Sequence, residues 1–345
     1  MTTGRVAALG TVGAAVAAGL APLPPAVVER WYSEGWYPHV QRALTRASNV
    51  VPVSIFDALC LAALVWVVWM VARAVRRDGV RGLLRAGAIV LVAAAAIYLV
   101  FLATWGLNYR RMPLERRLAY DPSLTTDAAT VALARTSARE MNRLYEAAHA
   151  GSRPNALRDA FFEAQRALGA PTLIVPGRPK PTLLGWYFQR AAIAGMTDPF
   201  FLEVMLAPGL LDVEEPFVLA HEWGHLAGFA DESEANFIGW LACMRGDARA
   251  RYSGWLAVFG HALAAVPGRD RGGILRTLEA GPREDLAKIA ERYASSSAVV
   301  RFAARETYDR YLKANRVAEG IESYDAVLEL ILGTSLGRST AAASR

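Results

Sequence analysis

The segment HEWGHLAGFADESEAN, residues 221–236, has two histidines four positions apart, with a glutamate directly after the first. Residues i and i+4 project from one face of a helix. His221 and His225 can therefore hold a single ion between them, with Glu222 beside it. The flanking stretches FVLA and LAGF are uncharged and predict a helix that can be buried. The alternative interpretation is a pair of histidines on a helix face, one of them satisfied by Glu222.

Two imidazoles at this spacing are typical ligands of Zn²⁺. Bound Zn²⁺ lowers the pKa of a water molecule and polarises a carbonyl group. Glu222 can then take the proton of that water as a general base and pass it to the leaving amine. A catalytic zinc site also needs a third protein ligand and an open position for water, so the residues that follow His225 decide the hypothesis.

Three acids compete for the place of the third ligand. The spacing HExxHxxGxxD selects Asp231. If ESEAN begins a second helix, Glu232 binds the metal, and Asn236 hydrogen-bonds the back of a histidine and fixes its tautomer. Glu234 lies two residues further along the same helix, and an acid at a helix start can also serve only as a cap. We favour Glu232, with Glu234 as the first alternative and Asp231 as the last.

Apolar segments occupy much of the first 112 residues, in a chain of 345 residues that is 54% hydrophobic. Three of them predict transmembrane helices, at about residues 6–23, 51–72 and 86–105. Residues 86–105 contain no charge, and at 1.5 Å per residue a helix of that length crosses a bilayer. Residues 6–23 can also be a secretory signal. The alternative interpretation of each segment is a buried core helix.

The orientation follows from the placement of arginines. The loop RAVRRDGVRGLLR, residues 73–85, carries five of them, and the positive-inside rule places it in the cytoplasm. The chain after residue 105 is then expected outside the cytoplasmic membrane. The basic stretch NYRRMPLERR argues the other way, but large domains translocate despite such charge.

Residues 113–337 read as one domain, with an α+β and mostly helical pattern. Helices are expected at 125–150, over the segment 154–169 that ends at Gly169, at 214–229, through 232–264 and in 283–336. The segment 171–208 is rich in β-formers and broken by Pro and Gly, which predicts short strands. One of them, Ala194–Leu206, is a candidate edge strand for a peptide substrate, although a plain structural strand fits equally well. Residues 338–345 are expected to form a disordered tail.

A peptidase also needs a donor for the oxyanion of the tetrahedral intermediate. Tyr308, Tyr311, Tyr324 and His261 are candidates, although tyrosines at helical spacing more often belong to the core. The net charge of +6 comes without a basic block or a nucleic-acid-binding motif, so we predict no nucleic-acid partner. The two cysteines, Cys60 and Cys243, do not form a disulfide framework.

The motif HEWGH with Glu232 and Asn236 resembles the gluzincin branch of zinc metallopeptidases, in which a glutamate on the next helix is the third ligand. This resemblance maps His221, Glu222, His225 and Glu232 onto the family scheme. Asn236 stands where many members have aspartate, and the gap between the two helices is unusually short.

A second resemblance covers about residues 31–332. It rests on GWYP, PVSIFD, WGLNYRRMPL, HEWGHLAGFADESEANF and YLKANRVAEGIESYDAVLELIL, and is to the bacterial membrane family called domain of unknown function 3810. It implies N-terminal membrane helices and a zinc-peptidase domain.

We therefore expect a multi-pass protein of the bacterial cytoplasmic membrane whose catalytic domain, zincin-like in fold, lies outside and hydrolyses a peptide or protein substrate. The alternative is a non-catalytic membrane sensor or assembly protein with a structural zinc site, although an intact Glu222 favours the enzyme. A transporter ranks lowest, since three spans leave little room for a pathway.

Overall fold

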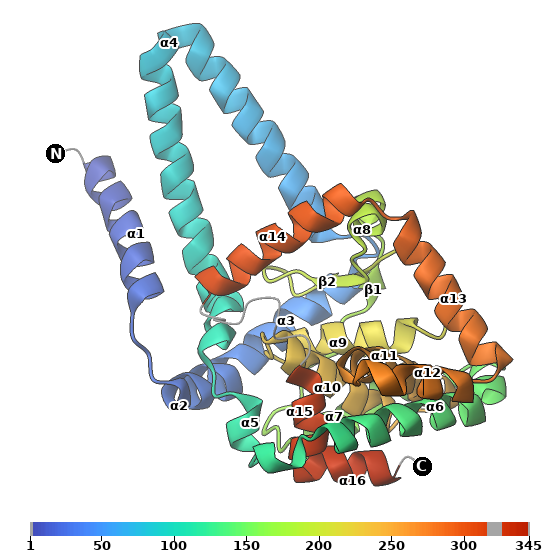
Figure 1. Cartoon of the computed structure of the whole chain (residues 1–345). Helices are drawn as coiled ribbons and strands as arrows, with labels where there is room; N and C mark the ends of the chain where they lie inside the picture. Colours follow the sequence, from blue (N-terminus) through green and yellow to red (C-terminus); the bar gives the residue numbers. More distant parts are fainter. Residues whose placement is uncertain (1–2, 316–325, 344–345) are drawn as a thin grey trace.

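The computed structural model describes residues 3–315 and 326–343 of the chain. Most of these residues are helical, and three short strands form one small sheet. Figure 1 shows a helical body from which a long bent helix, α4 (Ile55–Thr104), projects on one side with α1 (Thr3–Leu20) beside it. The mostly helical character expected from the sequence is confirmed, whereas the zincin-like arrangement stays a prediction.

Short elements precede and follow α4 before the helices of the body begin. They are α2 (Pro25–Val27), the π-helix η1 (Val28–Trp36), α3 (Tyr37–Val50), the 3₁₀ helices η2 (Gly106–Arg110) and η3 (Pro122–Leu124), and α5 (Leu114–Arg117). The remaining helices are α6 (Asp127–His149), α7 (Ala156–Ala167), α8 (Gly185–Ala191), α9 (Glu215–Leu226), α10 (Glu232–Cys243), α11 (Ala248–Ala265), α12 (Gly268–Thr277), α13 (Ala280–Ser295), α14 (Ala298–Ala314), α15 (Val327–Gly333) and α16 (Ser335–Ala343).

Helix α4 is a hairpin of two helical arms. Gly79 interrupts it with φ 55° and ψ −131°, a conformation that glycine adopts without steric cost, and the chain reverses there (Figure 1). We call residues 55–78 the first arm and residues 80–104 the second arm. Both arms expose many large apolar side chains to their surroundings.

The prediction of three membrane spans is not confirmed. Among the described residues, α4 is the one helix that is long and apolar enough to cross a membrane. A second candidate arises only if α1 is combined with residues 25–50 across a bend of 109°. The predicted spans 51–72 and 86–105 both fall largely in α4, because the arginine-rich segment between them is itself helical apart from Gly79. The structure therefore supports one or two candidate spans.

The first arm of α4 is fixed to the sheet by a buried ion pair. Glu203 accepts hydrogen bonds from the backbone amides of Ile55 (2.9 Å) and Phe56 (3.1 Å), which open the helix. The same carboxylate pairs with Lys180, and both side chains are inaccessible to solvent. A carboxylate at a helix N-terminus is favoured by the helix dipole, so the start of α4 has a defined position on the body.

The sheet has the strand order β1–β3–β2, with β1 (Pro179–Lys180) parallel and β2 (Gly195–Thr197) antiparallel to β3 (Val204–Leu206). The predicted strand Ala194–Leu206 is thus a hairpin of β2 and β3 rather than one strand. Helix α8 interrupts the region expected to hold only strands. β2 is an edge strand and packs against α9, which places it beside the histidines.

Segments on both sides of residue 112 contribute to a single core. All twelve residues of α10 are buried, and α6, α9 and α11 surround the core. Tyr37, Phe101 and Trp105 belong to the same hydrophobic cluster. The boundary expected at residue 112 does not coincide with a break in packing.

Several helix ends agree with the sequence analysis, and one expectation is wrong. The hydroxyl of Thr126 accepts a hydrogen bond from Ala129 N (3.2 Å) and caps α6. Gly169, with φ +72°, follows the end of α7. The expected disordered tail at 338–345 is helical as far as Ala343, where α16 packs on α15, and residues 344 and 345 lie outside the described part of the chain.

Candidate metal centre

Two glycines bring α9 and α10 into close contact. A Cβ atom added at Gly239 would lie 3.0 Å from the backbone nitrogen of His221, and one added at Gly224 would lie 3.1 Å from Cα of Ala235. The chain turns between the helices through Gly228, whose φ is +79°. This short connection sets the first turn of α10 against the histidine face of α9.

The side chains of His221, His225 and Glu232 converge on one point. Oε2 of Glu232 lies 3.3 Å from Nε2 of His221 and 3.5 Å from Nε2 of His225. The two imidazole rings are nearly perpendicular, with centroids 4.7 Å apart. One ligand atom from each residue lies within 4.8 Å of the others, a spacing that a single ion can bridge.

Hydrogen bonds from distant segments hold the C-terminal end of α9. Nδ1 of His225 lies 2.8 Å from the carbonyl oxygen of Phe229, an arrangement that places the proton on Nδ1 and leaves Nε2 free for a metal. Nε1 of Trp105 donates to the carbonyl of His225 (3.0 Å), and the hydroxyl of Tyr37 donates to the carbonyl of Leu226 (2.7 Å). The position of His225 is therefore fixed from the back.

Glu232 is a buried carboxylate with two differently engaged oxygens. The hydroxyl of Tyr308 donates a hydrogen bond to Oε1, whereas Oε2 has no hydrogen-bond donor among the described residues and faces the two histidines. Burial acts to raise the pKa of Glu232, but the neighbouring histidines hold that pKa well below its usual value. Burial likewise acts to lower the pKa of His225, while Glu232 raises it to about 9. The site thus favours a negative carboxylate and positive charge beside it.

Glu222 lies next to this cluster, on the side of strand β2. The hydroxyl of Thr197 donates to its Oε2 at 2.7 Å. A Cβ atom added at Gly195 would lie only 2.7 Å from Oε1, so the strand passes directly over the carboxylate. Burial raises the pKa of Glu222, and the charge of His221 acts in the opposite direction.

A sequence profile of the family described as protein of unknown function (DUF3810) matches residues 32–332. The chain belongs to the DUF3810 family. Among curated proteins and among solved structures, no match is found for this DUF3810 member. The matched range includes both the α4 hairpin and the residues His221, His225 and Glu232.

In this DUF3810 member the other predicted acids are engaged elsewhere. Asp231 caps α10 by accepting from Ser233 N (2.9 Å), and Glu234 accepts from the backbone amide of Leu114. Asn236 was expected to support a histidine, but its Nδ2 has no hydrogen-bond partner within the described part of the chain. Phe229 O is the group that supports His225 instead. The geometry thus brings Glu232, rather than Glu234 or Asp231, to the histidines.

Among the candidate oxyanion donors within the described residues, Tyr308 contacts the cluster directly, through its hydrogen bond to Glu232. Tyr311 stacks on Tyr308 with ring centroids 6.0 Å apart, His261 lies in α11, and Tyr324 lies outside the described residues. Sequence reasoning did not single out Thr197, because a threonine in a short strand carries no motif of its own.

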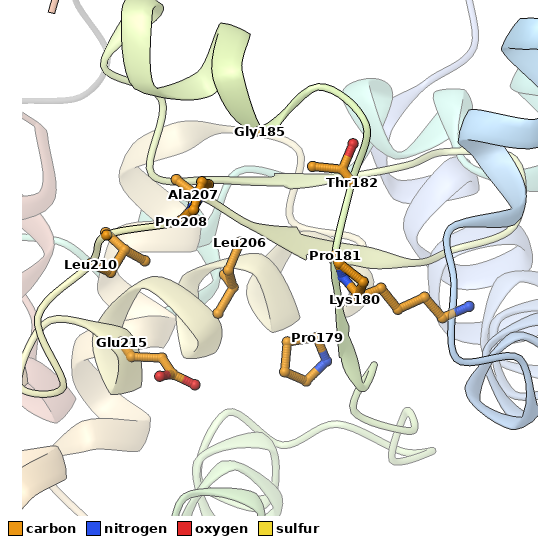
Figure 2. A pocket seen from close by; sticks show the side chains of 11 residues that line it. Pro179, Lys180, Pro181, Thr182, Gly185, Leu206, Ala207, Pro208, Leu210 and Glu215 are labelled. Carbon is orange, nitrogen blue, oxygen red and sulfur yellow. The ribbon is translucent and has the colours of Figure 1, made fainter.

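A separate cavity of about 420 Å³ lies beside the sheet, between β1, the loop after β3 and the first turn of α9 (Figure 2). Leu206, Pro208 and Leu210 line it from one side, and Glu215 from the first turn of α9. Lys180 also lines the cavity (Figure 2), and its ammonium group pairs with Glu203, the residue just before β3. None of the three converging ligand residues lines the cavity.

Proposed function

We propose that this DUF3810 member is a membrane-anchored, zinc-dependent peptidase that hydrolyses peptide bonds in a peptide or protein substrate. The observation that carries the proposal is the convergence of His221, His225 and Glu232 with Glu222 beside them. This combination resembles the ligand set of gluzincin metallopeptidases, which supports the proposal.

Two nitrogen donors and one carboxylate oxygen fit Zn²⁺ as a ligand set. Oε2 of Glu232 is buried and has no hydrogen-bond donor among the described residues. This oxygen lies 3.3 Å and 3.5 Å from the Nε2 atoms of His221 and His225, and a cation held by all three residues would compensate its buried charge. When bound there, zinc would lower the pKa of a water molecule and polarise the substrate carbonyl.

Glu222 supplies the proton-transfer group. Its carboxylate takes a proton from the attacking water and returns it to the leaving amine. Thr197 fixes the orientation of Oε2, and burial raises the pKa of Glu222, which makes it a stronger base. A purely structural zinc site needs no such carboxylate, so its presence favours the enzyme over the structural alternative.

The free edge of β2 is suited to hold an extended peptide. Met196 pairs with Met205 of β3. On either side, Ala194 O accepts from Ala207 N (2.8 Å) and Asp198 N donates to Glu203 O (3.0 Å), so residues 194, 196 and 198 face β3. In an antiparallel ladder the intervening residues direct their backbone groups to the other edge. The amide and carbonyl groups of residues 195 and 197 are therefore placed to pair with a substrate strand beside Glu222.

The α4 hairpin supplies the membrane anchor in this proposal. Residues 55–72 of the first arm span about 27 Å at 1.5 Å per residue, close to the thickness of a hydrocarbon core. Both arms would cross the bilayer, and the tip with Arg76 and Arg77 would emerge in the cytoplasm by the positive-inside rule. The body with the metal ligands would then lie outside the cytoplasmic membrane.

Metal analysis combined with a proteolysis assay tests the enzyme. Purified full-length protein should retain about one zinc ion per chain and cleave members of a mixture of unstructured peptides, detected by mass spectrometry. Glu222→Gln should retain the zinc and lose cleavage. The matched control Glu215→Gln, an exposed position on the same helix, should retain both. Cleavage by Glu222→Gln at the wild-type rate, or a wild-type protein that binds no zinc, would refute the proposal.

A further inference from the structure

Helix α14 is held to the rest of the molecule on one side only. Leu312 is its single buried residue. Its start is tied to α8 by a hydrogen bond from Ser297 N to Arg190 O (3.0 Å), and its inner face carries Tyr308, which reaches Glu232. Figure 1 shows α14 crossing the side of the body from which α4 projects. The opposite face of α14 is open.

Four large apolar side chains are exposed on this side of the molecule. Val299 and Phe302 of α14 have 78% and 71% of their surface exposed, and Leu183 and Trp186 at the start of α8 have 70% and 64%. We call these four residues the α8–α14 apolar surface. Helices α8 and α14 contact each other, so the four residues belong to neighbouring elements. Apolar groups gathered in this way on a protein surface indicate an interaction site.

The two elements that carry the α8–α14 apolar surface each contact one end of the α4 hairpin. At the start of the first arm, Asp57 accepts a hydrogen bond from Leu183 N (2.7 Å). At the end of the second arm, the ring of Phe101 meets Tyr311 of α14 with centroids 6.5 Å apart. The segment before α8 therefore contacts the first arm, and the C-terminal half of α14 contacts the second arm.

A chain of aromatic rings joins the same two ends. Phe200, in the turn between β2 and β3, stacks on Phe56 of the first arm (6.2 Å between centroids) and contacts Phe101 of the second arm (6.4 Å). These packed rings fix both ends of the hairpin against the body, next to the segment before α8 and next to α14.

Positive charge accompanies the apolar residues. Arg301 and Arg305 on α14 have no carboxylate partner within the described part of the chain, whereas Arg310 is paired with Glu306. Arginine side chains near a membrane surface attract anionic lipid headgroups. A helix with apolar residues on one face and arginines beside them is typical of one that lies in the interface.

We propose that the α8–α14 apolar surface is embedded in the headgroup region of an anionic phospholipid bilayer, with α14 lying along the membrane above the metal ligands. This inference rests on the insertion of the α4 hairpin. It adds that the body is held against the membrane and that Tyr308 is presented to Glu232 by a membrane-bound helix. It does not depend on bound zinc or on cleavage.

The test measures the depth of labelled residues in vesicles of phosphatidylcholine and phosphatidylglycerol. Exposed Cys60 is replaced by Ala, and Cys243 stays because it is buried. Full-length protein is then labelled at one new cysteine, Phe302→Cys or Trp186→Cys, with a polarity-sensitive fluorophore. Leu275→Cys, an exposed apolar position on α12 far from α4 (Figure 1), is the matched control. Leu64→Cys in the first arm reports insertion of the hairpin.

We expect lipids with a nitroxide near the headgroup to quench the labels at positions 302 and 186, and not the label at 275. Lipids with a nitroxide deep in the acyl chain should quench the label at position 64. If position 64 is quenched while 302 and 186 behave like 275, this inference is overturned and the anchor stands. If position 64 is also unquenched, the anchor itself fails and the inference fails with it. Disulfide cross-linking between two chains at position 302, together with protection from the lipid probe, would assign the surface to a second copy instead and would equally overturn it.

Discussion

Thr197 connects the edge strand to the carboxylate that we propose as the base. Its hydroxyl donates both to Oε2 of Glu222 (2.7 Å) and to the carbonyl of the same residue (3.0 Å). One side chain therefore fixes the rotamer of Glu222 and the distance between β2 and α9. Groups that orient a reacting residue in this way affect the rate more than the binding of substrate.

Replacement of Thr197 by Val keeps the shape of the side chain and removes the hydrogen bond. We expect kcat to fall about 10- to 100-fold, the usual cost of losing such a supporting partner, with KM and zinc content unchanged. Thr197→Ser restores the hydroxyl and should recover most of kcat. Steady-state kinetics with one cleaved peptide measures this effect. A Val variant with full activity would show that Glu222 needs no support from β2.

Asp198, next along the chain, makes stability depend on pH. Burial raises the pKa of its carboxyl to about 6, although the amides of Phe200 and Phe201 act against the shift. The folded protein therefore keeps this proton to a higher pH than the unfolded chain does. Between about pH 4 and pH 6 the free energy of unfolding should fall as pH rises, by up to about 3 kcal/mol. Above pH 6 this contribution is lost.

The Asp198→Asn variant cannot ionise at this position. Its melting temperature in detergent, measured from pH 4 to pH 6.5, should therefore decline less steeply than that of the wild type. If the melting temperatures of the two proteins change with pH in the same way, the pKa of Asp198 is not raised in the folded protein.

At the scale of elements, the close approach of α9 and α10 depends on two glycines, Gly224 and Gly239. A methyl group at Gly239 would meet the backbone of His221 rather than a flexible side chain. The two helices would have to separate, and His221 would move away from Glu232. Overpacking of this kind typically costs about 1–3 kcal/mol.

Gly239→Ala should therefore lower both thermal stability and zinc affinity. Gly260, within α11, has open space around its added Cβ, so Gly260→Ala is the matched control and should stabilise the protein by about 1 kcal/mol. Thermal unfolding and competition with a zinc chelator measure the two effects. An unchanged zinc affinity in Gly239→Ala would show that the ligand geometry tolerates wider helix spacing.

The sequence predicted local features better than long-range ones. The placement of His221 and His225 on one face follows from helical periodicity alone, and the cap of α6 at Thr126 was expected from the sequence. Tyr308 lies 76 positions from Glu232, and only the packing of α14 brings it there. The helical reversal at Gly79 was not expected, because charged residues usually end a membrane segment. Arginine is nevertheless a good helix former, so the first arm continues through the arginine-rich segment as far as Gly79.

At the scale of the whole molecule, the hairpin divides the chain between its basic tip and the body. If both arms cross the bilayer, these two parts lie in different compartments. Arg77→Cys in a Cys60→Ala background should react with a membrane-impermeant thiol reagent only from the cytoplasmic side. Alkaline phosphatase fused after Arg345 should be active, since it requires an extracytoplasmic location. Labelling and phosphatase activity on the same side would contradict the hairpin crossing.

The C-terminal end of α9 depends on residues that lie before Pro113 in the sequence. The carbonyl groups of His225 and Leu226 accept hydrogen bonds from Trp105 and Tyr37. Tyr37 begins α3, and Trp105 directly follows the second arm of α4. A protease that cut the chain just before Pro113 would release a fragment lacking both donors, with polar groups uncovered behind His225. We therefore expect a fragment that begins at Pro113 to hold His225 less firmly than the intact chain does.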